Sequence, residues 1–199
     1  MAVAVEHEKR RKKILEKALS VFIEDGFEDA TFQKIADRCG ITRTILYLYF
    51  KNKREIFTYS IKQLLLKVEE EINTIRNDKS LACTDKITNI LLTVFKYSEK
   101  NRQLLAVILD YLLHLSKGDI NPEERVRRRT VRLRRILSSI ILQGVQSGEL
   151  IKIKVKPAHD YLYSFIESGI FHLVVLKREN LDELKEAVIL AVRQLKAAK

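Results

Sequence analysis

The chain has 199 residues, a formal net charge of +11 and a pI near 9.6. Its 2 cysteines, Cys39 and Cys83, are too few for a disulfide framework and too far apart for a typical zinc motif. The first 13 residues lack the apolar run of a signal peptide, and no stretch approaches the roughly 20 apolar residues of a membrane span. We therefore expect a cytoplasmic protein with reduced thiols and without a membrane partner.

The basic excess favours polyanionic partners, because neutralising phosphates releases their counterions, although a basic solvated surface would give the same composition. Only 6 glycines and 2 prolines occur, and apolar residues recur at helical spacing along most of the chain. We predict an all-α fold with an N-terminal three-helix head and a larger helical body. The alternating segment Leu150–Lys156 is interpreted as a connector. The expected helices are a first one that ends at Asp25–Gly26 with Gly26 as a left-handed C-cap, and then 32–38, 43–49, 53–76, 84–99, 101–116, 122–147, 157–177 and 181–197.

Two short helices joined by a glycine-containing turn predict a helix-turn-helix near the N-terminus. Thr31 and Thr42 precede the two helices as N-caps, and Cys39-Gly40-Ile41 forms the turn. A helix that enters a major groove must stay polar on its outer side. The second short helix meets this requirement with the outward side chains of Arg43, Thr44 and Tyr47.

Longer motifs in this region support the same interpretation. The run Thr31–Thr42 resembles the motif T-x-x-x-I-A-x-x-x-G-V-S of the TetR family, and Arg43–Lys53 resembles the family's x-G-T-L-Y-Y-H-F-x-S-K. Phe22–Phe27 also resembles the family's F-x-x-x-G-F. The resemblance implies a helix-turn-helix DNA-binding domain over residues 1–53 and a helical ligand-binding and dimerisation domain over residues 54–199. It further implies a ligand-responsive dimeric transcriptional regulator, a repressor, that binds palindromic double-stranded operator DNA.

The resemblance also assigns candidate DNA contacts. Arg43 lies where the family commonly reads base edges, and its forked guanidinium suits a guanine. Thr44 replaces a common glycine or alanine, so it either adds a base contact or fills space. The positions that correspond to backbone contacts in the family are Tyr47, Tyr49 and Lys53, of which Tyr49 also fits core packing. The two caps, Thr31 and Thr42, are expected to be able to hydrogen-bond phosphates as well. The basic residues Lys9 and Arg10 either reach the minor groove or the phosphates, or they belong to a frayed helix start.

The last two expected helices are candidates for a homodimer interface. Gly144–Leu150 resembles the family's G-x-x-x-G-E-L corner, which precedes two helices that usually pair with those of a second subunit. The helix at 157–177 is apolar nearly all round, as expected when one side faces the core and another faces a partner. A monomer with both helices internal is the alternative.

A small-molecule effector is expected in the body, although the resemblance does not identify it. Its candidate contacts are Leu65, Val68, Tyr97, Tyr111, His114, Phe165 and Glu167, each of which also fits ordinary core or surface. Arg125, Arg128, Arg132 and Arg135 recur at helical spacing. This stripe is either a solvated face paired with acidic side chains or a site for an anionic effector such as a coenzyme-A thioester.

The sequence offers no support for catalysis. It contains no glycine-rich phosphate loop and no nucleophile motif, and its histidines lack metal-ligand spacing. We therefore expect no enzyme activity, no metal and no cofactor. The alternative to a DNA-binding regulator is a helical small-molecule binding or scaffold protein whose head no longer reads DNA.

Overall fold

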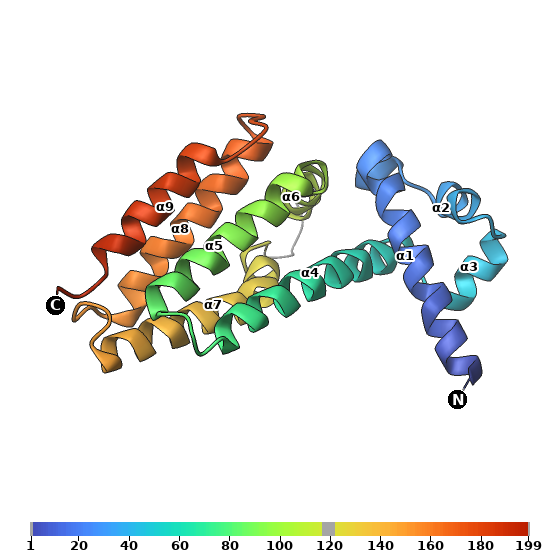
Figure 1. The fold of residues 1–199 in the computed structure, drawn as a ribbon. Coiled ribbons are helices and arrows are strands. Elements are labelled where there is room, and N and C mark those ends of the chain that lie inside the picture. Colours follow the sequence, from blue (N-terminus) through green and yellow to red (C-terminus); the bar gives the residue numbers. More distant parts are fainter. Residues whose placement is uncertain (1, 117–121, 199) are drawn as a thin grey trace. The chain divides into compact units, whose positions relative to one another are not determined.

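The computed structural model describes residues 2–116 and 122–198, and within them the only β-structure is one antiparallel bridge between Leu150 and Lys196. The predicted all-α fold is therefore confirmed. Among the described residues, no helix is both long and apolar enough to cross a membrane. The helices (Figure 1) are α1 (Ala2–Asp29), α2 (Phe32–Cys39), α3 (Arg43–Tyr49), α4 (Lys53–Asn77), α5 (Cys83–Lys100), α6 (Arg102–Ser116), α7 (Pro122–Ser147), α8 (Val155–Val174) and α9 (Asp182–Gln194).

The helices form two compact units, here called the head unit and the body unit. The head unit comprises the residues up to Lys67 together with Ala106–Tyr111, and the body unit comprises Val68–Leu105 and the residues from Leu112 onward. The helices α4 and α6 each contribute to both units. The head unit reaches beyond residue 53 because Ile56 and Phe57 of α4 are fully buried in its core. The functional division at residues 53 and 54 remains a prediction.

An aromatic cluster forms the centre of the head unit. The ring of Phe57 on α4 lies 4.9 Å from that of Phe22 and 5.1 Å from that of Phe27, both on α1. Tyr111 on α6 completes the cluster, with its ring 4.4 Å from Phe27 and 5.2 Å from Phe57. All four rings are buried, so the segment of α6 that carries Tyr111 is part of the head core.

The first helix differs from its prediction at Gly26. The helix α1 was expected to end there with a left-handed cap, but helical structure resumes beyond Gly26 and continues to Asp29. Gly26 has φ 78° and ψ 175°, a conformation outside the left-handed helical region and one that only glycine adopts readily. The chain therefore changes direction at Gly26, and Phe27 is directed into the aromatic cluster.

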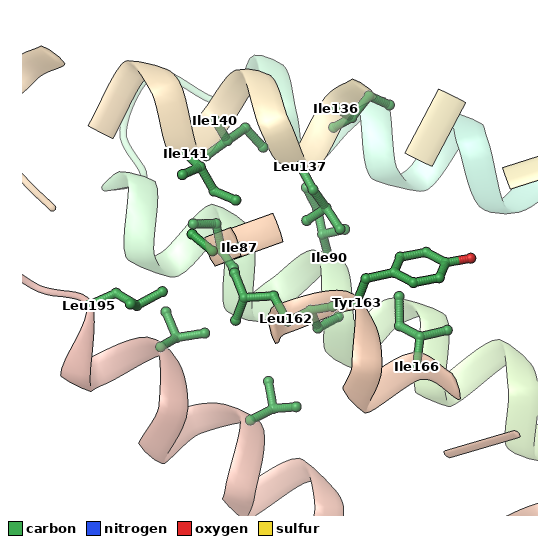
Figure 2. Close-up of a cluster of buried hydrophobic side chains, with 14 of the residues drawn as sticks. Ile87, Ile90, Ile136, Leu137, Ile140, Ile141, Leu162, Tyr163, Ile166 and Leu195 are labelled. Carbon is green, nitrogen blue, oxygen red and sulfur yellow. The ribbon is translucent and has the colours of Figure 1, made fainter. Parts of the chain in front are cut away.

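The body unit has a core of branched aliphatic side chains from four helices. Figure 2 shows side chains of α5, α7 and α8 directed toward one another, with Leu195 beyond the end of α9 beside them. The helix α8 begins at Val155 and ends at Val174, so the predicted limits of 157 and 177 were both late. Pro157 is accommodated because it stands in the first turn, where no intrahelical N–H bond is needed. The labelled core residues are Ile87, Ile90, Ile136, Leu137, Ile140, Ile141, Leu162, Tyr163, Ile166 and Leu195.

The corner between α7 and α8 explains the spacing of its motif residues. Gly144 leaves room for Leu150, since a Cβ at Gly144 would lie 2.7 Å from the Leu150 Cδ1 and Cγ atoms. Gly148 takes a positive φ of 76°, which reverses the chain. Glu149 then reaches α5, where its Oε2 accepts a hydrogen bond from the backbone N–H of Cys83 at 2.7 Å. The motif therefore holds the end of α7 against the start of α5 through this hydrogen bond.

The Glu149 carboxylate acts as an N-cap from outside the helix that it caps. The position before α5 is Ala82, which has no side-chain oxygen to accept the first N–H groups. The hydrogen bond from the Cys83 N–H holds the pKa of Glu149 below its ordinary value of 4.5. Burial in the same corner raises the pKa of the Cys83 thiol, and the nearby negative charge of Glu149 adds to this effect.

Replacing Glu149 by Ala is expected to lower the free energy of unfolding by about 1 kcal/mol at pH 7, the usual effect of losing an N-cap. Because the folded-state pKa is depressed, the stabilisation is fully present above the ordinary pKa near 4.5 and is lost as the pH falls through the folded pKa. Urea unfolding of wild type and variant between pH 7 and pH 3 measures the difference. Glu186→Ala, on an exposed part of α9, serves as the control. A difference that stays constant down to pH 3 would contradict the assignment.

Candidate nucleic-acid interface

The helices α2 and α3 form a helix-turn-helix with both predicted N-caps in place. The Thr31 Oγ1 accepts a hydrogen bond from the Lys34 N–H, and the Thr42 Oγ1 accepts one from the Ile45 N–H, each at 3.2 Å. Gly40 closes α2 in the left-handed conformation, with φ 68° and ψ 37°. This conformation needs little strain energy only in glycine, so the turn residue sets the angle between the two helices.

The outer face of α3 is polar and ordered by its own contacts. Arg43 donates a hydrogen bond from Nη2 to the Tyr47 hydroxyl at 3.0 Å, and its guanidinium lies 5.5 Å from the Tyr47 ring centroid. That ring stacks on Phe32 of α2, with 4.6 Å between centroids. Arg43, Thr44 and Tyr47 are exposed, whereas Leu46 on the opposite side is fully buried. The side chain that would contact a base is therefore supported from α2 through Tyr47.

Tyr49 and Lys53 have contacts within the head unit. The Tyr49 ring is half-buried and stacks on His7 of α1 at 4.5 Å. Lys53 donates hydrogen bonds from its amine to the carbonyl oxygens of Phe27 at 2.9 Å and Glu28 at 2.6 Å. The same amine lies 4.8 Å from the Phe27 ring centroid. Lys53 thus satisfies carbonyl groups at the end of α1, a role that its sequence position did not indicate.

Replacing Lys53 by Ala is expected to lower the free energy of unfolding by about 1–3 kcal/mol, because two hydrogen bonds from a charged, partly buried amine are lost. The Lys53 side chain is 29% exposed, so solvent replaces these bonds only in part. Chemical denaturation of the full chain measures the change. Lys51→Ala is the matched control, since Lys51 is exposed and its backbone hydrogen bond to Glu55 survives the substitution. Equal stability of the two variants would show that Lys53 has no capping role.

The basic residues of α1 lie on a helix rather than on an extended arm. Lys9 and Arg10 are exposed, and with Lys13 and Lys17 they line a groove of about 360 Å³ beside the turn at 39–41. Arg11 faces elsewhere, with its guanidinium 4.3 Å from the Tyr59 ring centroid and 5.1 Å from that of Phe50. Sequence reasoning did not separate Arg11 from its neighbours, although its position in the helical repeat differs from that of the groove residues.

The candidate effector contacts are divided between the two units. Leu65 and Tyr111 belong to the head unit, and Tyr111 is a core residue there. The other five belong to the body unit. Val68 packs against its core, Tyr97 forms a side-chain hydrogen bond with Glu71, and His114 is exposed. The Phe165 ring packs edge-on against Tyr161, and the Glu167 carboxylate faces Arg134. Their described contacts are thus with other residues and do not define a common pocket.

The structure describes the side chains of only part of the arginine stripe of α7. The side chains of Arg125 and Arg128 lie outside the described residues. Arg132 pairs with Glu69 of α4 at 2.6 Å, as expected for a solvated charged face. Arg134 lies outside the stripe. Its guanidinium is 3.8 Å from the Tyr163 ring centroid and 3.9 Å from the Glu167 carboxylate, and its Nε is buried without a hydrogen-bond partner among the described residues.

The helices α8 and α9 expose apolar side chains on one side while burying others. Leu162, Ile166 and Leu173 of α8 are buried in the body core. Leu190 of α9 is 60% exposed. The exposed apolar residues of α8 and the segment that follows it are Tyr161, Phe171, Val175 and Leu176.

The head resembles known proteins in sequence, and nearly the whole chain resembles known proteins in fold. Residues 14–59 match the family model for bacterial regulatory proteins of the tetR family. The fatty acid metabolism regulator protein of Bacillus subtilis (strain 168) is 26% identical over 163 residues, which are 79% of this chain and 80% of that protein. Longer sequence similarity thus extends beyond the helix-turn-helix into the body.

Solved structures share the fold over nearly the full chain. A TetR transcription regulator from Haloarcula marismortui ATCC 43049 has a TM-score of 0.79 at 18% identity, covering 94% of this chain and 97% of that one. The transcriptional regulator FadR from Bacillus subtilis, solved in complex with stearoyl-CoA, has a TM-score of 0.72 at 24% identity, covering 92% and 97%.

Proposed function

Because this chain belongs to the TetR family of transcriptional regulators, we propose that it binds operator DNA as a homodimer through α3 and leaves it when an effector binds to the body. The observation that carries the proposal is the outer face of α3. Arg43 is exposed there, capped helices hold the backbone around it, and Tyr47 holds its guanidinium. A pre-ordered arginine on a groove-entering helix suits bidentate recognition of guanine.

The proposed DNA contacts fall into two groups. Arg43 and Thr44 face the bases from α3, and Thr31, Thr42, Tyr47, Tyr49 and Lys53 position the head on the phosphates together with Lys9 and Arg10 of α1. Backbone contacts fix the register without specifying a sequence, whereas contacts with base edges specify it. In the free protein, Lys53 and Tyr47 already have partners, so a phosphate contact by either would add to or replace those bonds.

A homodimer through α8 and α9 would cover the apolar side chains that these helices expose. Large exposed apolar patches are uncommon on monomers and mark interaction surfaces. Tyr161 and Phe171 of α8 and Leu190 of α9 support this assignment. A symmetric dimer presents two equivalent heads, and its operator is then an inverted repeat.

Selection from a pool of random duplexes with the purified full chain tests the DNA-binding proposal. The expected product is an inverted repeat whose half-site centres lie about one helical turn apart or a multiple of it. A pool that shows no enrichment at low salt and without ligand would instead support a helical small-molecule binding protein whose head does not read DNA.

We further propose that the effector is an anionic thioester of the fatty acyl-CoA class. The similarity to a fatty acid metabolism regulator over most of the chain supports this class, as does the stearoyl-CoA complex of a protein with the same fold. In this chain, the buried Nε of Arg134 has no hydrogen-bond partner among the described residues, and the guanidinium lies over the Tyr163 ring and 3.9 Å from the Glu167 carboxylate.

Stearoyl-CoA, free coenzyme A and stearate are the three probes that test the effector class. Stearoyl-CoA should lower the affinity for the selected operator, and the operator should lower the affinity for stearoyl-CoA by the same factor, because coupling is reciprocal. Arg134→Gln should weaken this coupling, whereas Arg178→Gln, which alters an exposed ion pair with Glu183, should leave it unchanged. Unchanged operator affinity with stearoyl-CoA would exclude this effector while leaving DNA binding intact.

A further inference from the structure

A large apolar side chain is mostly exposed on the helix that faces DNA in the proposed function. Leu48 of α3 is 75% exposed, and it is the most exposed large apolar side chain among the described residues. A single exposed leucine is ordinary on a protein surface. Leu48, however, stands on the helix that enters the groove in the proposed function, where an apolar side chain can contact bases.

The helical register places Leu48 beside the polar pair of α3. With about 100° of rotation per residue, the exposed residues Arg43, Tyr47, Thr44 and Leu48 cover an arc of roughly 140°. They form two adjacent rows with a spacing of four residues. One row, Arg43 and Tyr47, is polar and internally hydrogen-bonded. The other row, Thr44 and Leu48, presents methyl groups on the same outer surface.

The thymine C5-methyl is the apolar group that an A·T pair, but not a G·C pair, displays on its major-groove edge. Leucine has no donor or acceptor, so it contributes nothing to a phosphate contact or to a hydrogen bond with a base. It can gain free energy only where its contact removes apolar surface from water. We propose that Leu48 is a specificity-determining residue that contacts the C5-methyl group of a thymine in each operator half-site.

This inference rests on the proposed function, since it requires that α3 enters the major groove. A protein partner is a weaker match for this surface. On the exposed arc of α3, the neighbours of Leu48 are Arg43, Thr44 and Tyr47, of which only Tyr47 is another large exposed apolar side chain, and the Tyr47 hydroxyl is hydrogen-bonded to Arg43. The alternation of a bidentate donor with methyl groups instead matches the mixed polar and apolar edge of a DNA sequence.

The test uses the full chain and the operator obtained by selection. Each thymine is replaced in turn by deoxyuridine, which removes the methyl group and keeps every hydrogen-bonding atom. At one thymine in each half-site, the replacement should weaken wild-type binding about fourfold, as expected for one buried methyl-sized group. In Leu48→Ala, the same replacement should cost less than about twofold, because the partner of the methyl group is gone.

Thr44→Ser is the matched control, since it removes the one other methyl group in the same row and leaves Leu48 in place. It should retain the full deoxyuridine effect at the thymine assigned to Leu48. Equal deoxyuridine effects in wild type and Leu48→Ala at every thymine would overturn the inference, while operator binding by both proteins would leave the proposed function standing. Failure of the selection to enrich any sequence would overturn both.

Discussion

Replacing Tyr111 by Ala is expected to lower the free energy of unfolding of the head unit by about 3–5 kcal/mol, the range for removing a large buried aromatic side chain. The Tyr111 ring contacts Phe27 and Phe57 at the centre of the aromatic cluster, and only 7% of the residue is exposed. A cavity of this size between two helices cannot be filled by small side-chain movements. Urea unfolding of the full chain measures the change, with operator binding and helicity as the two signals that monitor it.

Tyr111→Phe is the control because it keeps the ring and removes the hydroxyl. The Tyr111 hydroxyl is buried and has no hydrogen-bond partner among the described residues. Removing an unsatisfied buried polar group is expected to leave stability unchanged or to raise it. A loss of several kcal/mol in Tyr111→Phe would instead show that the hydroxyl has a partner in solution, and a neutral Tyr111→Ala would place Tyr111 outside the head core.

Replacing Arg43 by Ala is expected to weaken binding to the selected operator roughly 10- to 100-fold and to relax the preference at one base pair per half-site. The loss corresponds to about 1–3 kcal/mol for a bidentate base contact. Arg43→Lys should restore little of the discrimination, because an ammonium group cannot form the two parallel bonds of the guanidinium. Competition binding with operators changed at single base pairs gives both the affinity and the preference.

Tyr47→Phe distinguishes positioning of Arg43 from a direct backbone contact. The variant keeps the ring that stacks on Phe32 and removes the hydroxyl that accepts the Arg43 hydrogen bond. If the hydroxyl acts by holding Arg43, its removal should reduce discrimination at the same base pair and have no effect in Arg43→Ala. Uniform weakening of all duplexes in both backgrounds would assign Tyr47 to the phosphates instead.

The features that the sequence predicted are those determined by nearby residues. Thr31 and Thr42 cap the helices that they precede, and Gly40 ends α2 in the left-handed conformation. Each of these depends on hydrogen bonds within a few residues of the chain. The spacing of apolar residues likewise predicted most helices, although it misplaced the limits of α8 by two to three residues and the end of α9 by three.

The features that sequence reasoning missed depend on contacts between distant residues. Glu149 caps α5 across a sequence separation of 66 residues. Lys53 donates hydrogen bonds to carbonyl groups of α1 that lie 25 and 26 residues earlier in the sequence. Tyr111 fitted an effector pocket in the body as well as it fitted a core, and only the packing of α6 places it in the head unit. Periodicity identifies a buried face but does not identify the helix that covers it.

The most direct test of the central claim is the ratio of affinities for the selected operator and for a shuffled duplex of the same length at physiological salt. Non-specific binding to phosphates depends on the basic surface alone, whereas the ratio depends on contacts with bases. We expect the operator to bind about 10³-fold or more tightly than the shuffled duplex, within the range of specific regulators. A ratio near one, with both affinities falling equally as salt increases, would show that the head binds DNA only through its charge and would contradict sequence-specific regulation by this chain.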